Sequence, residues 1–237
     1  MKFWAVLASD WIKIRKRGLW LLAVLGPVGT VAMQALNYGL RYDYLLKLYE
    51  EDLWTGLLDS VMMFVPISLY LGITLICSLL AGIEHQTNSW KQLLALPIGR
   101  FPVYASKLTV AFALLLFSCV LLALLTIVLG LLLGFGADAI PYAGILKLSF
   151  LPFLGSLPGL AVLLWFCLTV KNQGLPITFG VVCAVFALVP KFDWLPVNWP
   201  GFAYFHPQSG WFATAGLAAG VVLFAMGALH FGRKDVE

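Results

Sequence analysis

The sequence predicts an all-α membrane protein with six transmembrane helices, an amino-terminal interfacial helix and both termini in the cytoplasm. Two observations lead to this prediction. Of the 237 residues, 62% are hydrophobic and only 11% are charged, whereas soluble domains carry roughly 25% charged residues. The charges are also grouped, leaving five uncharged intervals of 19 to 30 residues and a longer one near the carboxyl terminus. Because about 20 apolar residues cross a bilayer core, each interval can hold one span.

The six spans form a single transmembrane domain over residues 1–237. Prolines interrupt the first half of the last uncharged interval, so we place the sixth span after Pro207. The expected spans cover approximately 19–39, 60–83, 107–133, 146–170, 174–190 and 209–231.

Lysine and arginine residues set the expected orientation. Eleven of them fall on the side that holds both termini, and the other side has only Arg41, Lys47, Lys147 and Lys191. The positive-inside rule then places both termini in the cytoplasm. The net charge of +4 is explained by this orientation, and we expect no nucleic-acid partner.

Residues 1–17 are expected to form an amphipathic helix at the cytoplasmic interface. Aromatic and aliphatic residues recur there at helical spacing, and basic residues lie beside them. Tryptophan favours headgroup depth and cations favour anionic lipid. The alternative is a basic flank that only sets the topology. The residues assigned to this helix are Trp4, Leu7, Trp11, Lys13 and Arg15.

The cytoplasmic segment 84–101, between the second and third spans, is predicted to contain a short helix. Ser89 followed by Gln92 fits a capping box, and Pro97 disfavours helix at the residue before it. About two turns remain, over 90–96.

This short helix has one apolar face. Trp90, Leu93 and Leu94 share that face, and Lys91 and Gln92 are turned away from it. A helix shorter than roughly 12 residues is marginal in water, so the face is expected to rest on something. It either folds back on the protein's own spans or binds the lipid interface or another protein.

Two further features lie in the second half of the chain. The aromatic and proline-rich segment 191–207 is interpreted as an outer lid or re-entrant turn, with Trp194, Trp199 and Tyr204 as gate residues. Small residues four positions apart allow helices to pack closely, within one chain or between two. They are Gly155, Gly159, Gly216 and Gly220.

The sequence contains little that indicates an enzyme. It has no G-x-x-x-x-G-K-[ST] loop for ATP and no H-E-x-x-H or G-x-S-x-G motif. We therefore expect no catalytic residue, no metal and no cofactor in this chain. No ionisable pair lies deep in a predicted span, which argues against a proton-coupled transporter.

Two stretches resemble ABC type-2 exporter permeases, particularly those of lantibiotic self-immunity and bacitracin resistance. The first is SDWIKIRKRGLWLLAVLGP, which resembles the opening pattern of these permeases, with Asp10 replacing the commoner Glu. The second is EHQTNSWKQLLALPIGRFPVYASK, which is similar to their loop between spans two and three. The resemblance extends over most of the chain in span number and loop lengths.

The resemblance implies a transport role in a bacterial cytoplasmic membrane. The loop would be the coupling helix that docks on a separate ATPase subunit, with Glu84 bracing the second span. Two permeases, identical or related, would pair with two ATPases that hold ATP and Mg²⁺. The substrate would be hydrophobic or amphipathic, such as a peptide antibiotic. The alternative is a non-transporting scaffold or sensor whose loop binds a signalling partner. The coupling residues implied are Glu84, Asn88, Trp90, Lys91, Leu93, Leu94 and Pro97.

Overall fold

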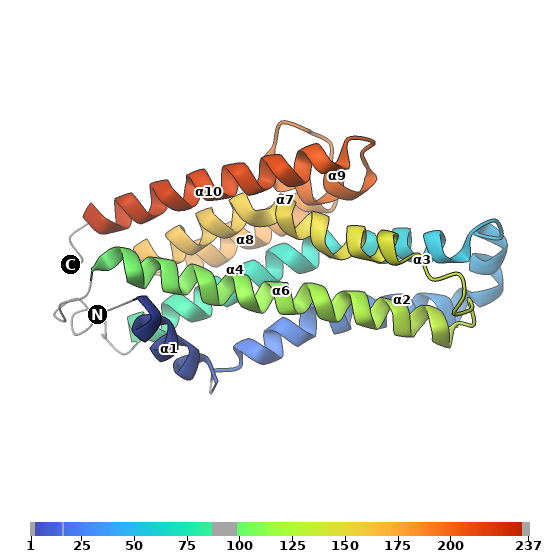
Figure 1. The fold of residues 1–237 in the computed structure, drawn as a ribbon, viewed down its shortest axis with the longest axis horizontal. Coiled ribbons are helices and arrows are strands. Elements are labelled where there is room, and N and C mark those ends of the chain that lie inside the picture. Colours follow the sequence, from blue (N-terminus) through green and yellow to red (C-terminus); the bar gives the residue numbers. More distant parts are fainter. Residues whose placement is uncertain (1–2, 16, 87–98, 234–237) are drawn as a thin grey trace.

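The computed structural model describes residues 3–15, 17–86 and 99–233, with the side chains of 84–86 left out. The regular structure of these residues is helical (Figure 1). Its elements are α1 (Phe3–Ile14), α2 (Leu19–Leu48), α3 (Leu53–Met62), α4 (Val65–Gln86), α6 (Arg100–Leu132), α7 (Tyr142–Thr169), α8 (Gly174–Ala187), the 3₁₀ turn η1 (Pro196–Asn198), α9 (Trp199–Phe205) and α10 (Ser209–Arg233).

Among the described residues, five helical segments are long and apolar enough to cross a membrane, which confirms the all-helical class predicted from the sequence. The apolar helix α8 is shorter, with 14 residues, and at 1.5 Å per residue it is only about 21 Å long. The five long segments are Leu19–Leu48, Leu53–Ile83, Arg100–Leu132, Tyr142–Thr169 and Ser209–Arg233.

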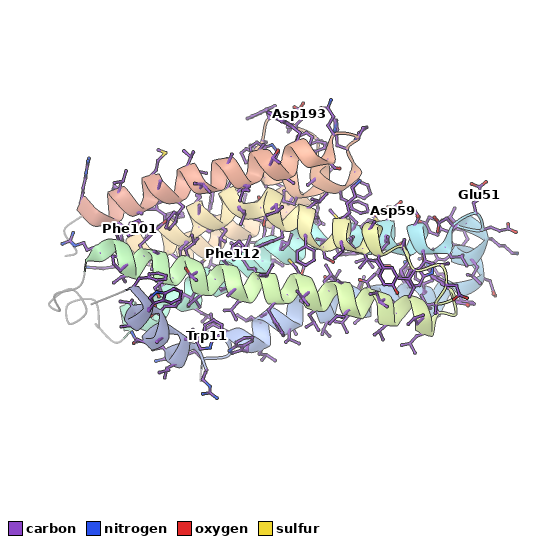
Figure 2. The ribbon with its side chains drawn as sticks, in the orientation of Figure 1. Trp11, Glu51, Asp59, Phe101, Phe112 and Asp193 are labelled. Atoms are coloured by element: carbon purple, nitrogen blue, oxygen red, sulfur yellow. The ribbon has the colours of Figure 1, made fainter. Side chains whose placement is uncertain are left out.

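The bundle has two distinct ends. Helix α1, the start of α6 and the last turn of α10 lie together at one end, which we call the terminal end (Figure 1). The far ends of α2 and α6 and the start of α3 lie at the other, which we call the distal end. Trp11 and Phe101 lie toward the terminal end and Glu51 marks the distal end, with Asp59 on α3 between the distal end and the middle of the bundle (Figure 2).

Helices α3 and α4 form one span with a break between them. Pro66 has no backbone N–H, so the helix ladder cannot run unbroken through this region. The N–H of Phe64 donates to the carbonyl of Val61 at 3.1 Å, three residues back. The carbonyl of Ser60 instead accepts from Nε2 of Gln34 in α2, at 2.7 Å. A polar side chain from a neighbouring helix thus supplies the hydrogen bond that the backbone does not make at the break.

Helix α2 is joined to α6 in a similar way. Pro27 lies inside α2, and its missing N–H leaves the carbonyl of Ala23 without the usual helical donor. The Ser118 hydroxyl of α6 donates to this carbonyl at 2.6 Å. The bond satisfies a backbone group within the bundle and fixes the register between the two helices.

Helices α7 and α10 pack with their backbones close together. A Cβ at Gly216 would collide with the backbone of Leu154 and Gly155, and a Cβ at Gly220 would lie 2.8 Å from the Cβ of Leu157. Both glycines of α10 therefore face α7, where only a hydrogen atom fits.

The two predicted packing glycines of α7 make close contacts with α9 and α4. A Cβ at Gly155 would lie 3.0 Å from the backbone of Trp199 and Pro200, at the start of α9. Gly159 leaves room for the ring of Tyr70, which is buried in α4. All four predicted packing glycines make their close contacts within the chain.

Candidate functional site

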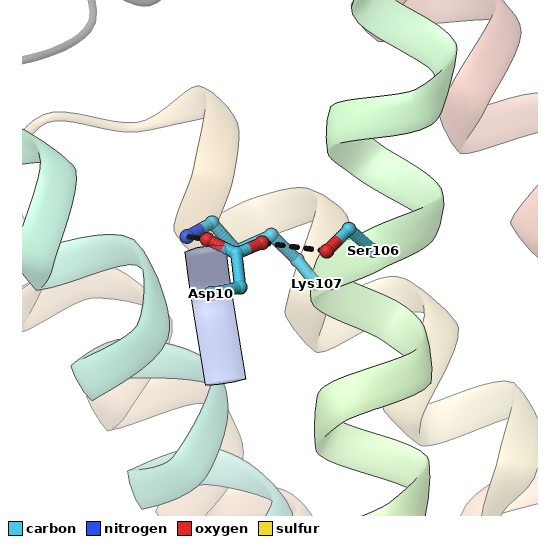
Figure 3. Close-up of polar contacts among 3 residues, drawn as sticks. All are labelled: Asp10, Ser106 and Lys107. Atoms are coloured by element: carbon cyan, nitrogen blue, oxygen red, sulfur yellow. Dashed lines mark hydrogen bonds and ion pairs between the residues drawn. The ribbon is translucent and has the colours of Figure 1, made fainter. Parts of the chain in front are cut away.

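The terminal end contains a buried ion pair between α1 and α6. Nζ of Lys107 lies 2.9 Å from Oδ1 of Asp10, and the Ser106 hydroxyl donates to Oδ2 of Asp10 at 2.7 Å. Figure 3 shows the three side chains meeting between the two helices. The relative exposure of Asp10 is 3% and that of Lys107 is 1%.

The position of Asp10 on α1 explains this burial. Val6, Asp10 and Ile14 are spaced four residues apart, so they share the face that packs on the bundle, and all three are buried. Trp4 and Trp11 lie on the open side, 73% and 39% exposed.

The other predicted interfacial residues are distributed between the two sides of α1. Leu7 packs against the core and Arg15 is exposed, and the half-buried Lys13 lies near the end of the helix. Trp11 also contacts Trp20 edge-on, with ring centroids 5.7 Å apart. Helix α1 is thus attached to the bundle by an inward face that contains a charge.

The sequence alone does not predict this pair. Its pattern places Lys107 at the lipid boundary and makes Asp10 one of the polar contacts of an interfacial helix. The sequence does contain one sign that Asp10 is buried. Asp10 is four residues from both Val6 and Ile14, so it lies on an apolar face of the helix. Its partner is 97 residues away, and no local pattern identifies that residue.

The pair joins the two stretches that carry the family resemblance. Asp10 belongs to the first stretch, and Ser106 and Lys107 end the second. The arrangement is closed to a substrate, because both charged groups are buried and directed at each other. Its chemical role is to hold two helices together.

Most of the predicted coupling residues lie outside the described part of the chain. These are Asn88, Trp90, Lys91, Leu93, Leu94 and Pro97. Glu84 belongs to the last turn of α4, and its side chain is also outside the description. The flanking helices end and begin at the terminal end, near α1 (Figure 1). There Arg100 donates to the carbonyl of Gly232 at 3.3 Å, linking α6 to α10.

The predicted gate residues lie in α9 and in the segment before it, and they have separate environments. The Tyr204 hydroxyl of α9 donates to Oδ1 of Asp59 at 3.0 Å, and Nζ of Lys147 lies 5.4 Å from the centre of the Tyr204 ring. Trp199 donates to the carbonyl of Asp193 at 2.7 Å, and Trp194 is 71% exposed. Among the described contacts of these three residues, those of Tyr204 form a polar cluster.

The hydrogen bond from Tyr204 to Asp59 connects α9 to α3. Burial, and then the neighbouring Asp59 carboxylate, raise the pKa of the Tyr204 hydroxyl above its usual value. The hydroxyl therefore stays protonated and keeps donating to Asp59 at neutral pH. Among the residues described, no three His, Cys, Asp or Glu side chains are grouped so that they could hold a metal ion.

Comparison with known families decides the assignment. The sequence model of the family described as ABC-2 family transporter protein matches residues 6–187, more than three quarters of the chain. The chain belongs to the ABC-2 transporter family. The matched region contains Asp10, Ser106 and Lys107, and it ends at the last residue of α8.

Membership of the ABC-2 family fixes the class of function. The chain is a membrane permease component, a transport protein without an ATPase domain of its own, and the family implies an ATP-binding partner subunit. No curated protein and no solved structure gives a significant match to the chain.

Proposed function

We propose that this ABC-2 permease is the membrane subunit of an exporter that moves a hydrophobic or amphipathic substrate out of the membrane or the cell. The observation that carries the transport role is the family match over residues 6–187. The substrate class rests on the resemblance of residues 9–27 and 84–107 to lantibiotic-immunity and bacitracin-resistance permeases. A peptide antibiotic is the substrate we expect.

We further propose that the chain crosses a bacterial cytoplasmic membrane six times, with α8 as the fifth span and both termini inside. The distribution of charge supports this orientation. Arg15 and Arg17 follow α1 and Arg100 begins α6, at the terminal end, whereas Glu50, Glu51 and Asp52 follow α2 at the distal end. The short α8 would be accommodated by local thinning of the bilayer.

In this proposal the segment 84–101 transmits movement of the ATP-binding subunit to the permease. Its apolar face, formed by Trp90, Leu93 and Leu94, docks on an ATP-binding subunit. The described flanks support this role, since α4 leads into the segment and α6 leads out of it at the terminal end. The buried Asp10–Lys107 pair, two turns into α6, would make α1 follow any movement of α6.

The complex contains two permeases, identical or related, and two ATP-binding subunits that carry ATP and Mg²⁺. Closure of the ATP-binding subunits would draw the two coupling segments together and tilt the spans. This movement would expose the substrate path to the other side of the membrane or expel a membrane-bound peptide sideways.

Affinity purification of the tagged chain from its native membrane tests this function. We expect an ATP-binding subunit to co-purify, alone if the permease is a homodimer and with a second permease chain if it is a heterodimer. Deletion of the chain should also lower tolerance to the exported compound. Purification without any ATP-binding subunit, together with unchanged tolerance, would instead support the scaffold or sensor alternative.

A further inference from the structure

A groove lies between α2 and α4, at the surface of the bundle. Its volume is about 390 Å³, which is within the range of ligand sites, about 300 to 1,000 Å³. Leu25 and Met33 of α2 and Ile67 and Leu71 of α4 give it apolar walls. Gly29 lies at its α2 side, where a Cβ added to the glycine would have no other atom within 4 Å.

A smaller chamber lies directly behind the groove. Its volume is about 40 Å³, and five residues line both spaces: Leu22, Gly26, Thr30, Ser68 and Gly72. The chamber reaches inward from α2 and α4 to α6 and α7, where Ser118 and Ser149 line it. The two spaces therefore form one path from the surface of the bundle to its interior.

Most residues that line the chamber are apolar, but the chamber holds more hydroxyl groups than the groove, which has only those of Thr30 and Ser68 among its described lining residues. Four hydroxyl groups line the chamber, those of Thr30, Ser68, Ser118 and Ser149. Thr30 donates its proton to the carbonyl of Gly26 at 2.9 Å and Ser118 donates to Ala23, so both hydroxyl oxygens still have lone pairs that accept. Ser149 is 1% exposed, and its hydroxyl has no hydrogen-bond partner among the described residues.

An unpartnered buried hydroxyl costs free energy that a bound polar group would recover. The described residues that line the groove and the chamber include no Asp, Glu, Lys or Arg. A charged group would therefore have no counter-charge in this space, and burying it there would be costly. The ligand that fits is neutral, with a hydrogen-bond donor at one end and an apolar chain at the other.

We infer that the groove and chamber bind a neutral single-chain amphiphile. Its hydroxyl or amide group lies in the chamber, where it donates to the oxygens of Thr30 or Ser118 and pairs with Ser149. Its chain lies in the groove, beside the acyl chains of the bilayer. This inference rests on the proposed export function. Within the hydrophobic or amphipathic substrates proposed there, it points to a neutral single-chain amphiphile and not to the peptide antibiotic that the resemblance implies.

Photolabelling of the purified chain in lipid nanodiscs, without any ATPase, tests the site. The probe is a monoacylglycerol with a diazirine in its acyl chain, and labelled peptides are identified by mass spectrometry. We expect labelling on α2 and α4, and loss of most of it in Gly29→Leu, whose side chain fills the groove. Gly39→Leu is the matched control, since Gly39 is in the same helix, does not line the groove and has open space around it.

Ser149→Ala tests the chamber separately. Removal of an unpartnered hydroxyl should leave thermal stability unchanged or slightly higher. Loss of one hydrogen bond to the probe should weaken labelling by about three- to tenfold.

Three results would overturn the inference: equal labelling of the Gly29→Leu and Gly39→Leu variants, equal labelling of Ser149→Ala and the unaltered chain, or equal competition by a fatty-acid anion and a monoacylglycerol. The first two are what a chamber that holds only water would give. None of these results bears on co-purification with an ATP-binding subunit, so the proposed function is judged separately. Specific labelling, combined with a native-membrane purification in which no ATP-binding subunit co-purifies, would support the site and reject the exporter.

Discussion

Asp10 and Lys107 form a 2.9 Å ion pair that is buried between α1 and α6. Removing one partner of a buried pair leaves an uncompensated charge and costs about 3 to 5 kcal/mol, whereas replacing both by apolar residues is often neutral. We expect Asp10→Ala to lower the free energy of unfolding in detergent by that amount. The double variant Asp10→Leu/Lys107→Met should recover most of the loss.

A thermodynamic cycle of the two single variants and the double variant measures this coupling. Arg15→Ala is the control, because Arg15 is exposed at the same end of the bundle and should change stability by less than about 0.5 kcal/mol. Additive effects at Asp10 and Lys107 would contradict the pairing.

The second prediction concerns the Ser118 hydroxyl, which donates to the Ala23 carbonyl of α2 in place of a backbone N–H. Ser118→Ala leaves the Ala23 carbonyl without its donor, which should cost about 1 to 3 kcal/mol. In a Pro27→Ala background, residue 27 has a backbone N–H that can donate to the Ala23 carbonyl. Ser118→Ala should then lower the free energy of unfolding by less. Thr109→Ala is the control, because the Thr109 hydroxyl donates to the Ala105 carbonyl of its own helix. Equal costs of Ser118→Ala in both backgrounds would refute this account.

The third prediction tests the close packing of α7 and α10. In Gly216→Ala the new methyl meets backbone atoms of Leu154 and Gly155, which cannot swing away as a side chain can. We expect a loss of roughly 1 to 3 kcal/mol from overpacking, measured as the detergent unfolding free energy. Gly210→Ala, in the same helix with open space around it, should be tolerated. A tolerated Gly216→Ala would mean that the two helices are further apart.

The fourth prediction concerns pH and the start of α3. The Thr55 hydroxyl and, next, the Thr55 backbone N–H donate to Asp52, and they hold the pKa of this carboxyl below its usual value. A lowered pKa in the folded state stabilises the protein above the unfolded pKa of about 3.9. This stabilisation is lost as the pH falls through the lower folded pKa.

Asp52→Asn isolates this contribution, because Asn caps a helix equally well but does not titrate. Between pH 7 and pH 3 the melting temperature of the unaltered chain should fall further than that of Asp52→Asn. Parallel changes in the two proteins would show that the Asp52 carboxylate does not stabilise α3.

The membrane-length helices were predictable because hydropathy is a local property. Uncharged intervals and prolines between them indicate where apolar helices lie, and the described part of the chain contains five such helices. The Asp10–Lys107 pair was not predictable in this way, since the two residues are 97 positions apart. Charges are also ordinary where each lies, Asp10 in a predicted interfacial helix and Lys107 at the start of a predicted span.

The hydroxyl groups of the inner chamber illustrate the same limit. Thr30, Ser68, Ser118 and Ser149 belong to four different helices, and each alone resembles a small polar residue that bonds to its own helix. Only the packing of α2, α4, α6 and α7 brings them around one space. The break between α3 and α4 depends likewise on Gln34 from another helix, which completes the ladder at Ser60.

We propose that the conformational change driven by ATP in a separate ATPase subunit is transmitted to the permease through the segment 84–101. The most direct test of this central claim is ATP hydrolysis by the purified complex in nanodiscs, with Leu94→Asp on the predicted apolar face and Gln92→Asp on the opposite face as control. We expect Leu94→Asp to abolish binding of the ATPase and its stimulation by substrate, with normal membrane insertion, while Gln92→Asp retains both. Full binding and stimulation in Leu94→Asp would contradict the claim.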